Sequence, residues 1–387
     1  MSHDFDHPPT RRGTDSLKWQ RYGDALPLWV ADMDFAAPEP VLEALHDRVR
    51  HGVFGYGAPP TKLTKVLCAR MAELYRWTVE PEQIVYLPGL VSGLNIVCRA
   101  IGEPGDEVLV QTPVYPPFLT APGQQERRLV TAELAAEPRA GRLYYTFDDD
   151  AFAAAIGPRT RLFILCHPHN PVGRAFEVEE LRRLAALCAR HGLTVCSDEI
   201  HCDLLFDGRR HTPFAALDPD IAQRCITLMA PSKTFNIPGL GASFAIIQNP
   251  ELRRRFQQAL RGIVPDANVL GLTAALAAYQ HGGAWLRDLL DYLAANRAFL
   301  VDAIDRTLPG LRTTVPDATY LAWLDCRETK IAGNPHRFFL ERAGVALNDG
   351  TTFGPGGAGF VRLNFGCARA TLAEALERMG TALATLG

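Results

Sequence analysis

Short apolar runs alternate with longer amphipathic stretches through the middle of the chain. The runs indicate strands buried on both faces, and they lie at residues 84–87, 107–111, 161–166, 193–196, 226–229 and 243–247, with further strands expected at 127–132 and 143–147. The stretches between them have helical spacing, as at residues 178–191. This alternation predicts an α/β fold with a mostly parallel sheet that is covered by helices on both faces.

The pattern changes toward both ends of the chain. Residues 1–26 are polar and lack periodicity, which indicates an extended arm. After residue 249 helices dominate, and only two further strands are expected, at 320–325 and 360–365. A chain of 387 residues is too long for one ordinary core. We therefore expect an N-terminal segment that packs on a small domain, a large domain, and a small α+β domain, at residues 1–35, 36–282 and 283–387.

Composition excludes several classes of function. The formal net charge of -3 gives no indication of binding to nucleic acid or to an anionic membrane. Residues 1–6 contain no apolar core of a signal peptide, and no window approaches the length of a membrane span. Nine cysteines, several of them in apolar runs, favour reduced thiols and a cytoplasmic protein over a disulfide framework.

Three polar residues, Asn170, Asp198 and Lys233, each follow the end of an expected strand. In parallel sheets, ligands bind at the carboxyl ends of the strands, so these side chains predict a site. Lys233 lies between two buried strands, where an ammonium is costly unless its pKa falls or it reacts. A desolvated lysine is a good nucleophile toward carbonyls and forms Schiff bases. The alternative is a lysine that extends to the rim of the sheet.

A pyridine aldehyde cofactor bound to Lys233 would need further groups, and the chain offers candidates. A buried carboxylate, Asp198, would keep the ring nitrogen protonated, and Asn170 would donate to the phenolic oxygen. Asp198 could instead cap a helix, and Asn170 could belong to an ordinary turn. The amides of residues 89–92, between a strand and a helix, would bind the phosphate, although many turns look similar.

Two more residues complete this set. Tyr115 would stack on the ring, with core packing as its alternative. Arg362 offers a planar fork for an amino-acid carboxylate, with a solvent-facing position as its alternative.

Several motifs together resemble a known family. SDEIH at residues 197–201, APSKTFN at 230–236, PHNPVG at 168–173 and FVRLN at 360–364 are similar to fold-type I pyridoxal-phosphate enzymes of the aminotransferase class I/II superfamily. WVADMDF at 29–35, TPVYPPF at 112–118 and RRGTDSLKW at 11–19 resemble its MalY/PatB-type cystathionine β-lyase (carbon–sulfur lyase) branch. The resemblance covers nearly the whole chain. It implies the PLP-dependent transferase fold, with a seven-stranded, mostly parallel sheet in the large domain.

The resemblance also implies roles for individual residues. The pyridoxal 5'-phosphate cofactor forms its Schiff base with Lys233, and its phosphate is held by Gly89, Leu90, Val91 and Ser232. Asp198, Asn170, Tyr115 and Arg362 keep the roles given above. Tyr56, in GYG at residues 55–57, corresponds to the tyrosine that reaches the phosphate of a neighbouring subunit, which implies a homodimer with shared active sites.

Three positions depart from the general aminotransferase pattern. Ala230 replaces a second serine, Gly241 replaces a phosphate-binding arginine, and His201 stands where transaminases have a tyrosine near the phenolic oxygen. These departures favour the lyase branch. The leading hypothesis is α,β-elimination of cystathionine, or of a related cysteine S-conjugate, to a thiol, pyruvate and ammonia.

Other interpretations stay open. An aminotransferase would use the same residues, and a regulatory protein that keeps the fold is the alternative from another class. A bound zinc ion is disfavoured, because no Cys-x-x-Cys spacing occurs. Asp32 and Asp34 could bind the distal ammonium of a substrate such as cystathionine, or they could be caps or turn residues. Any protein partner is unknown.

Overall fold

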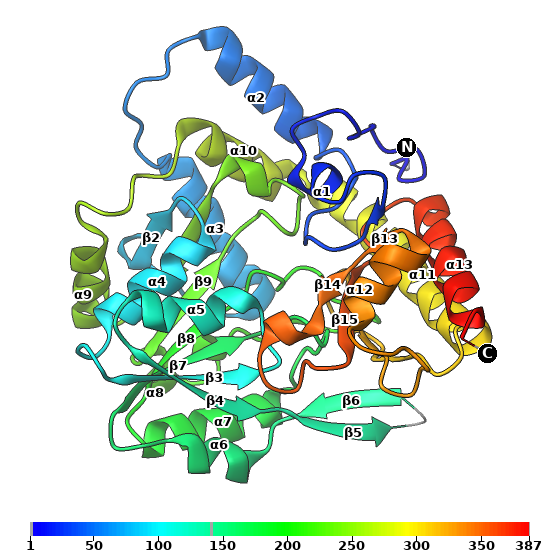
Figure 1. The fold of residues 1–387 in the computed structure, drawn as a ribbon. Helices are drawn as coiled ribbons and strands as arrows, with labels where there is room; N and C mark the ends of the chain where they lie inside the picture. Colours follow the sequence, from blue (N-terminus) through cyan, green and yellow to red (C-terminus); the bar gives the residue numbers. More distant parts are fainter. Residues whose placement is uncertain (1–2, 140–141, 387) are drawn as a thin grey trace.

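A seven-stranded sheet forms the centre of the computed structural model, which describes residues 3–139 and 142–386 (Figure 1). Its strands, in spatial order, are β2 (Ile84–Leu87), β10 (Ser243–Ile246), β9 (Cys225–Met229), β8 (Thr194–Asp198), β7 (Thr160–Cys166), β3 (Glu107–Thr112) and β4 (Arg128–Glu133). β10 is antiparallel to both of its neighbours, while the pairs from β9 to β4 are parallel. The predicted mostly parallel, seven-stranded sheet is confirmed.

Helices cover both faces of this sheet because alternate strand residues point to opposite sides. Leu109, Phe163 and Val195 pack on one side with α3 (Thr61–Tyr75), α6 (Asp149–Ala155), α7 (Val178–Arg190) and α10 (Val269–His281). Val110 and Ile164 pack on the other side with α4 (Leu90–Ala100), α5 (Pro116–Gln124) and α9 (Pro250–Leu260). The central strands β7, β8 and β9 are almost wholly buried, which explains why they lack polar alternation.

A second region contains a four-stranded antiparallel sheet in the order β11 (Arg312–Thr313), β12 (Leu321–Asp325), β15 (Phe360–Asn364) and β14 (Asn348–Asp349). The long helices α11 (Gly283–Thr307) and α13 (Arg369–Ala384) share its hydrophobic core. β1 (Leu26–Pro27) pairs in parallel with β13 (Val345–Ala346), so the N-terminal segment lies against this region. The exact division of the chain into three parts stays a prediction.

Several elements differ from the expectations. The strand expected at 143–147 is β6 (Arg142–Thr146), but it pairs with β5 (Ala135–Arg139) in a separate hairpin that projects from the main sheet in Figure 1. β5 is largely exposed, so no apolar pattern marked it. The arm contains one helical turn, α1 (Leu17–Gln20). α2 (Glu39–His51) precedes a loop of exposed residues at 52–59.

The remaining helical segments are short. α12 (Pro335–Phe338) continues into a π-helical turn (Phe339–Ala343), and α8 (Pro219–Ala222) precedes β9. In the described part of the chain, no helix combines the length and the apolar character that crossing a membrane requires.

Candidate active site

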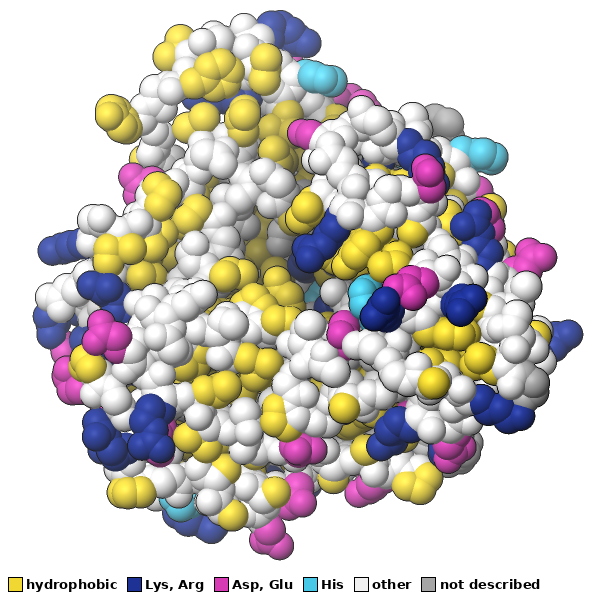
Figure 2. Space-filling model, in the orientation of Figure 1, with side chains coloured by type: hydrophobic (Ala, Val, Ile, Leu, Met, Phe, Trp, Pro, Cys, Tyr) yellow, Lys and Arg dark blue, Asp and Glu magenta, His cyan; other side chains and the backbone are white. Residues whose placement is uncertain are grey.

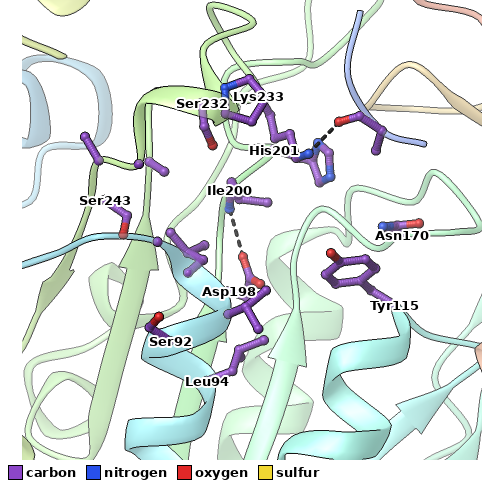
Figure 3. Close-up of a pocket in the computed structure, with 18 of the residues that line it drawn as sticks. Ser92, Leu94, Tyr115, Asn170, Asp198, Ile200, His201, Ser232, Lys233 and Ser243 are labelled. Atoms are coloured by element: carbon purple, nitrogen blue, oxygen red, sulfur yellow. Dashed lines mark hydrogen bonds between the residues drawn. The ribbon is translucent and has the colours of Figure 1, made fainter. Parts of the chain in front are cut away.

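A cavity of about 240 Å³ lies at the carboxyl ends of β7, β8 and β9. Figure 2 shows a hollow in the middle of the molecular surface, with Lys and Arg side chains at one rim. Most of the predicted residues line the cavity together: Gly89, Leu90, Val91, Tyr115, Asn170, Asp198, His201, Ser232 and Lys233. The labelled side chains in Figure 3 converge from the β8 end, the β9 end, α4 and α5. The strand-end argument thus located the site.

Lys233 lies in the turn after β9, and its side chain is only partly exposed. Its Nζ donates a hydrogen bond of 2.5 Å to the backbone oxygen of Ala31, the upper dashed line in Figure 3. The pKa of Lys233 is lowered to about 8, chiefly by desolvation. The charge of Arg362 also lowers this pKa, whereas Asp32 and Asp198 oppose the shift. The amine is therefore partly neutral near physiological pH, as a nucleophile or base requires.

Asp198 is the last residue of β8, and its side chain is buried. Its Oδ1 accepts a hydrogen bond of 3.1 Å from the backbone amide of Ile200. The chain continues as a turn rather than a helix, so the helix-cap interpretation was wrong. Burial raises the pKa of Asp198 to about 7, and the neighbouring Glu199 adds to this rise. A cationic group in the cavity would stabilise the carboxylate, which is the pairing that a protonated pyridine nitrogen provides.

Arg362 is buried, at 3% exposure, so the solvent-facing interpretation was wrong. Its Nη1 donates to Asn170 Oδ1 at 3.0 Å, and its Nη2 donates to the oxygen of Trp29 at 2.8 Å and to Asn348 Oδ1 at 2.5 Å. Burial lowers the pKa of Arg362 to about 10, so it stays charged at neutral pH. Because Asn170 Oδ1 accepts from Arg362, its amide NH₂ is left to donate into the cavity.

His201 and Tyr115 supply the remaining polar side chains near Lys233. Burial lowers the pKa of His201 to about 3, and the charges of Lys233 and Arg362 act in the same direction, so the imidazole stays neutral. Within the described residues its Nδ1 has no hydrogen-bond partner, and neither has Nε of Arg362. Tyr115 lies at the start of α5, where burial raises the pKa of its hydroxyl. A ligand that offers acceptors would satisfy these buried donors.

The phosphate end of the expected site combines backbone and hydroxyl donors. Gly89 precedes the first turn of α4, whose free amides point to the N-terminal side. Ser232 lines the same cavity, as do Ser92 and Ser243, two hydroxyls that were absent from the predicted set. Ser92 could have been predicted, because it belongs to residues 89–92, whose amides were expected to bind the phosphate. Nothing in the sequence of β10 marked Ser243.

Gly241 explains why the arginine of other aminotransferases is missing here. Its φ is +57°, and a Cβ at this position would lie 2.9 Å from the backbone oxygen of Pro88. Any side chain would therefore be strained in the left-handed region and would collide with the neighbouring loop. The local backbone favours glycine, and phosphate charge must be balanced by other groups.

Three predicted residues are absent from the cavity lining. Arg362 is one of them, and it is bonded to the lining residue Asn170. Tyr56 is fully exposed on the loop at 52–59 and borders a separate hollow next to residues 265–270. Asp32 is absent from the cavity lining and pairs with Arg11 at 2.7 Å, while Asp34 pairs with Arg11 and with Lys18, each at 3.0 Å. Neither aspartate is the simple cap that was considered. A role for Asp32 in substrate binding stays a prediction.

A segment that we call the strap, residues 28–35, supplies acceptors that sequence reasoning missed. Ala31 O accepts from Lys233 and also from the hydroxyl of Tyr320 at 2.9 Å. Asn236, at the end of the lysine motif, donates to Met33 O at 2.9 Å and accepts from the Met33 amide at 2.9 Å. Backbone oxygens carry no residue identity, so only the unusual Asn236, with φ +54°, could have indicated this contact.

The donor set fits pyridoxal 5'-phosphate on three independent features: a lysine with a lowered pKa, a buried carboxylate with a raised pKa, and a helix N-terminus flanked by serines. A metal centre has no comparable basis. The described residues contain no group of three His, Cys, Asp or Glu side chains that could hold a metal ion. All nine cysteines are free thiols.

Comparisons with known proteins agree with this geometry. Cystathionine beta-lyase PatB of Bacillus subtilis (strain 168) is 43% identical over 388 residues, which cover 98% of this chain and 99% of PatB. A crystal structure of OvoB is 46% identical with a TM-score of 0.93, covering 98% of this chain and 99% of OvoB. The PLP-bound C–S lyase from Staphylococcus hominis is 32% identical with a TM-score of 0.92, covering 98% and 99%.

These solved structures confirm the predicted fold. The family described as "Aminotransferase class I and II" matches residues 24–379. The chain therefore belongs to the aminotransferase class I and II family, in the branch that contains PatB.

Proposed function

We propose that this protein is a pyridoxal-phosphate-dependent carbon–sulfur lyase. It would cleave cystathionine, or a related cysteine S-conjugate, by α,β-elimination to a thiol, pyruvate and ammonia. The observation that carries the proposal is the convergence of Lys233, Asp198 and Asn170 on one cavity, with Arg362 hydrogen-bonded to Asn170. The identity with PatB along the whole chain supports elimination as the reaction.

The cofactor, when bound, supplies an electron sink for the carbanion at the substrate Cα. Lys233 would hold it covalently, and Asp198 would keep the ring nitrogen protonated. The Asn170 amide and the neutral His201 would donate to the phenolic oxygen, and Tyr115 would cover one face of the ring. The amides after Gly89, with the serine hydroxyls, would bind the phosphate.

Arg362 would bind the substrate carboxylate and so fix the orientation of the Cα–H bond. The free amine of Lys233, whose pKa is about 8, would then take the Cα proton. The Cβ–S bond breaks and the sulfur leaves as a thiolate, a better leaving group than an alkoxide because its conjugate acid is the stronger acid. Water then converts the remaining three-carbon fragment to pyruvate and ammonia.

A second copy of the chain would complete the site. Val53, Phe54 and Tyr56 are exposed on the loop at 52–59, and Phe54 and Tyr56 border the hollow near residues 265–270. Exposed apolar side chains of this density are typical of an interface. In a homodimer with shared active sites, Tyr56 would reach the phosphate bound by its partner.

The test is product analysis with cystathionine and purified protein that carries the cofactor. The proposal expects thiol, pyruvate and ammonia in equal amounts, with no keto acid required. Conversion of the cofactor to its amine form, reversed only by a keto acid, would instead identify an aminotransferase. Cofactor binding without turnover of any cysteine S-conjugate would support the alternative of a regulatory protein.

A further inference from the structure

The strap lies between the two residues on which the proposed reaction depends most. On the side of β9, its Ala31 oxygen accepts from Lys233 Nζ at 2.5 Å. On the side of β15, its Trp29 oxygen accepts from Arg362 Nη2 at 2.8 Å. Between these bonds, Asn364 Nδ2 donates to the oxygens of Val30 at 2.6 Å and Asp32 at 2.7 Å. The backbone of the strap therefore contacts both Lys233 and Arg362.

The N-terminal arm holds the strap through buried charges. Asp34 is 6% exposed, and its carboxylate accepts from Lys18 Nζ at 3.0 Å, Arg11 Nη1 at 3.0 Å and Trp19 Nε1 at 3.0 Å. Arg11 also binds Asp32 Oδ2 at 2.7 Å and the Met33 oxygen at 3.1 Å. The Lys18 side chain is completely buried. We call these residues, Arg11, Lys18, Trp19, Asp32 and Asp34, the arm clamp.

Charge and burial suggest that the arm clamp does more than join the arm to the body. Lys18 and Asp34 are removed from water here, while Arg11 and Asp32 are partly exposed. A buried ion pair is often no more stabilising than apolar residues of the same size. Its advantage is geometric, since several directional bonds fix one backbone position. The strap needs such a constraint because its oxygens must meet donors that lie on two different sheets.

We propose that Arg11 and Lys18 are positioning residues for the reaction: by holding the strap, they set the positions of the Lys233 amine and the Arg362 fork. They touch neither substrate nor cofactor and act through Asp32, Asp34 and the strap oxygens. The expected effect on kcat rests on the proposed function. The expected effect on the position of the strap does not.

The test compares Arg11→Gln with Arg182→Gln in the full-length enzyme with cofactor. Arg182 is an arginine on α7 whose side chain is 58% exposed and pairs with Glu179, outside the arm clamp. For Arg11→Gln we expect faster hydrogen–deuterium exchange in peptides covering residues 28–35. We also expect kcat to fall about tenfold, because a small displacement of reacting groups slows the reaction. Arg182→Gln should stay within about twofold of wild type.

A pH titration separates positioning from a general loss of stability. Lys233 faces the charges of Asp32, Asp198 and Arg362. Loss of Arg11 leaves Asp32 less neutralised, which favours the protonated form of the lysine nitrogen. The pH midpoint of the cofactor's visible absorption change should therefore move upward in Arg11→Gln, and it should stay unchanged in Arg182→Gln.

The second variant is Lys18→Met, which keeps the length of the side chain and removes the buried charge. If it does not fold, Arg11→Gln carries the test, since the Arg11 side chain is 25% exposed and Lys18 still pairs with Asp34. A folded Arg11→Gln enzyme with wild-type exchange, kcat, KM and pH midpoint would overturn the proposal. If wild type releases no pyruvate, the proposed function fails, while exchange and the pH midpoint still decide whether Arg11 positions the strap.

Discussion

The strand ends and the strap build the same site by different means. Asn170, Asp198 and Lys233 follow β7, β8 and β9, and each contributes its own side chain. The strap contributes backbone oxygens, and its position depends on side chains far away in the sequence. Chemistry at the strand ends is thus concentrated in single residues, whereas positioning by the strap is shared among many hydrogen bonds. Substitutions should accordingly have large effects at the strand ends and graded effects around the strap.

The largest effect is expected for Lys233→Ala. Loss of the attachment point and of the base should lower kcat at least about a thousandfold, the upper part of the range for one general base. Pyruvate release from cystathionine measures the loss. Lys62→Ala, at an exposed position on α3, is the control and should behave like wild type. Comparable activity of Lys233→Ala and Lys62→Ala would contradict the claim that chemistry at the strand ends is concentrated in single residues.

Arg362→Lys tests the residue that joins the strap to the substrate. Lysine cannot reproduce the planar fork that contacts Asn170 and Trp29. We expect kcat/KM to fall about a hundredfold, mainly through KM, as for the loss of a buried charged hydrogen bond. The control is Arg327→Lys, which follows β12 and whose side chain is 55% exposed. An unchanged KM in Arg362→Lys would contradict the role in carboxylate binding.

Asn236→Gly probes the strap without touching a charge. Glycine tolerates the φ of +54° at this position but removes the bonds to the Met33 backbone and to the Phe35 oxygen. We expect kcat to fall about tenfold, with the free energy of unfolding lowered by about 1–3 kcal/mol. Steady-state kinetics and urea unfolding measure the two effects. A loss of stability with kcat unchanged would show that the strap does not govern positioning.

An effect on stability alone is expected for the pH dependence of folding in protein freed of cofactor. The pKa of Asp198 rises from 3.8 to about 7 on folding, so the folded state binds the extra proton between these values. Stability should therefore fall as pH rises through this window, by about 1.4 kcal/mol per pH unit for this one group. Asp198→Asn should remove this contribution in urea unfolding from acidic to neutral pH. Identical pH profiles in the two proteins would contradict a buried, protonated Asp198.

The comparison also explains how much of the site the sequence could predict. Asn170, Asp198 and Lys233 were accessible because apolar strands end at recognisable places and parallel strands end at one edge. Arg362 was located correctly on β15, although its burial depends on packing that the alternating pattern does not reveal. Strand β5 had no signal because its side chains are exposed and follow no apolar pattern, although its partner β6 was predicted. The ion pairs of Asp32 had none because they join residues distant in sequence.

The strap was the least predictable part. Apart from Asp32 and Asp34, which were candidates for binding a substrate ammonium, WVADMDF at 29–35 and the arm residues Arg11 and Lys18 were noted only as motifs of a resemblance. Their physical connection is a set of backbone oxygens and buried charges that only the folded chain brings together. A motif whose residues have no evident chemical role can thus mark residues that position the reactive groups of other residues.

The central claim is that Lys233 is the residue to which the cofactor attaches and from which the reaction proceeds. Borohydride reduction of the purified enzyme, followed by peptide mass spectrometry, tests it most directly. The account predicts that the reduced cofactor is found on the peptide containing Lys233, and that prior incubation with cystathionine in excess lowers this labelling. Labelling of a different lysine, or no labelling of an enzyme that still releases pyruvate, would contradict it.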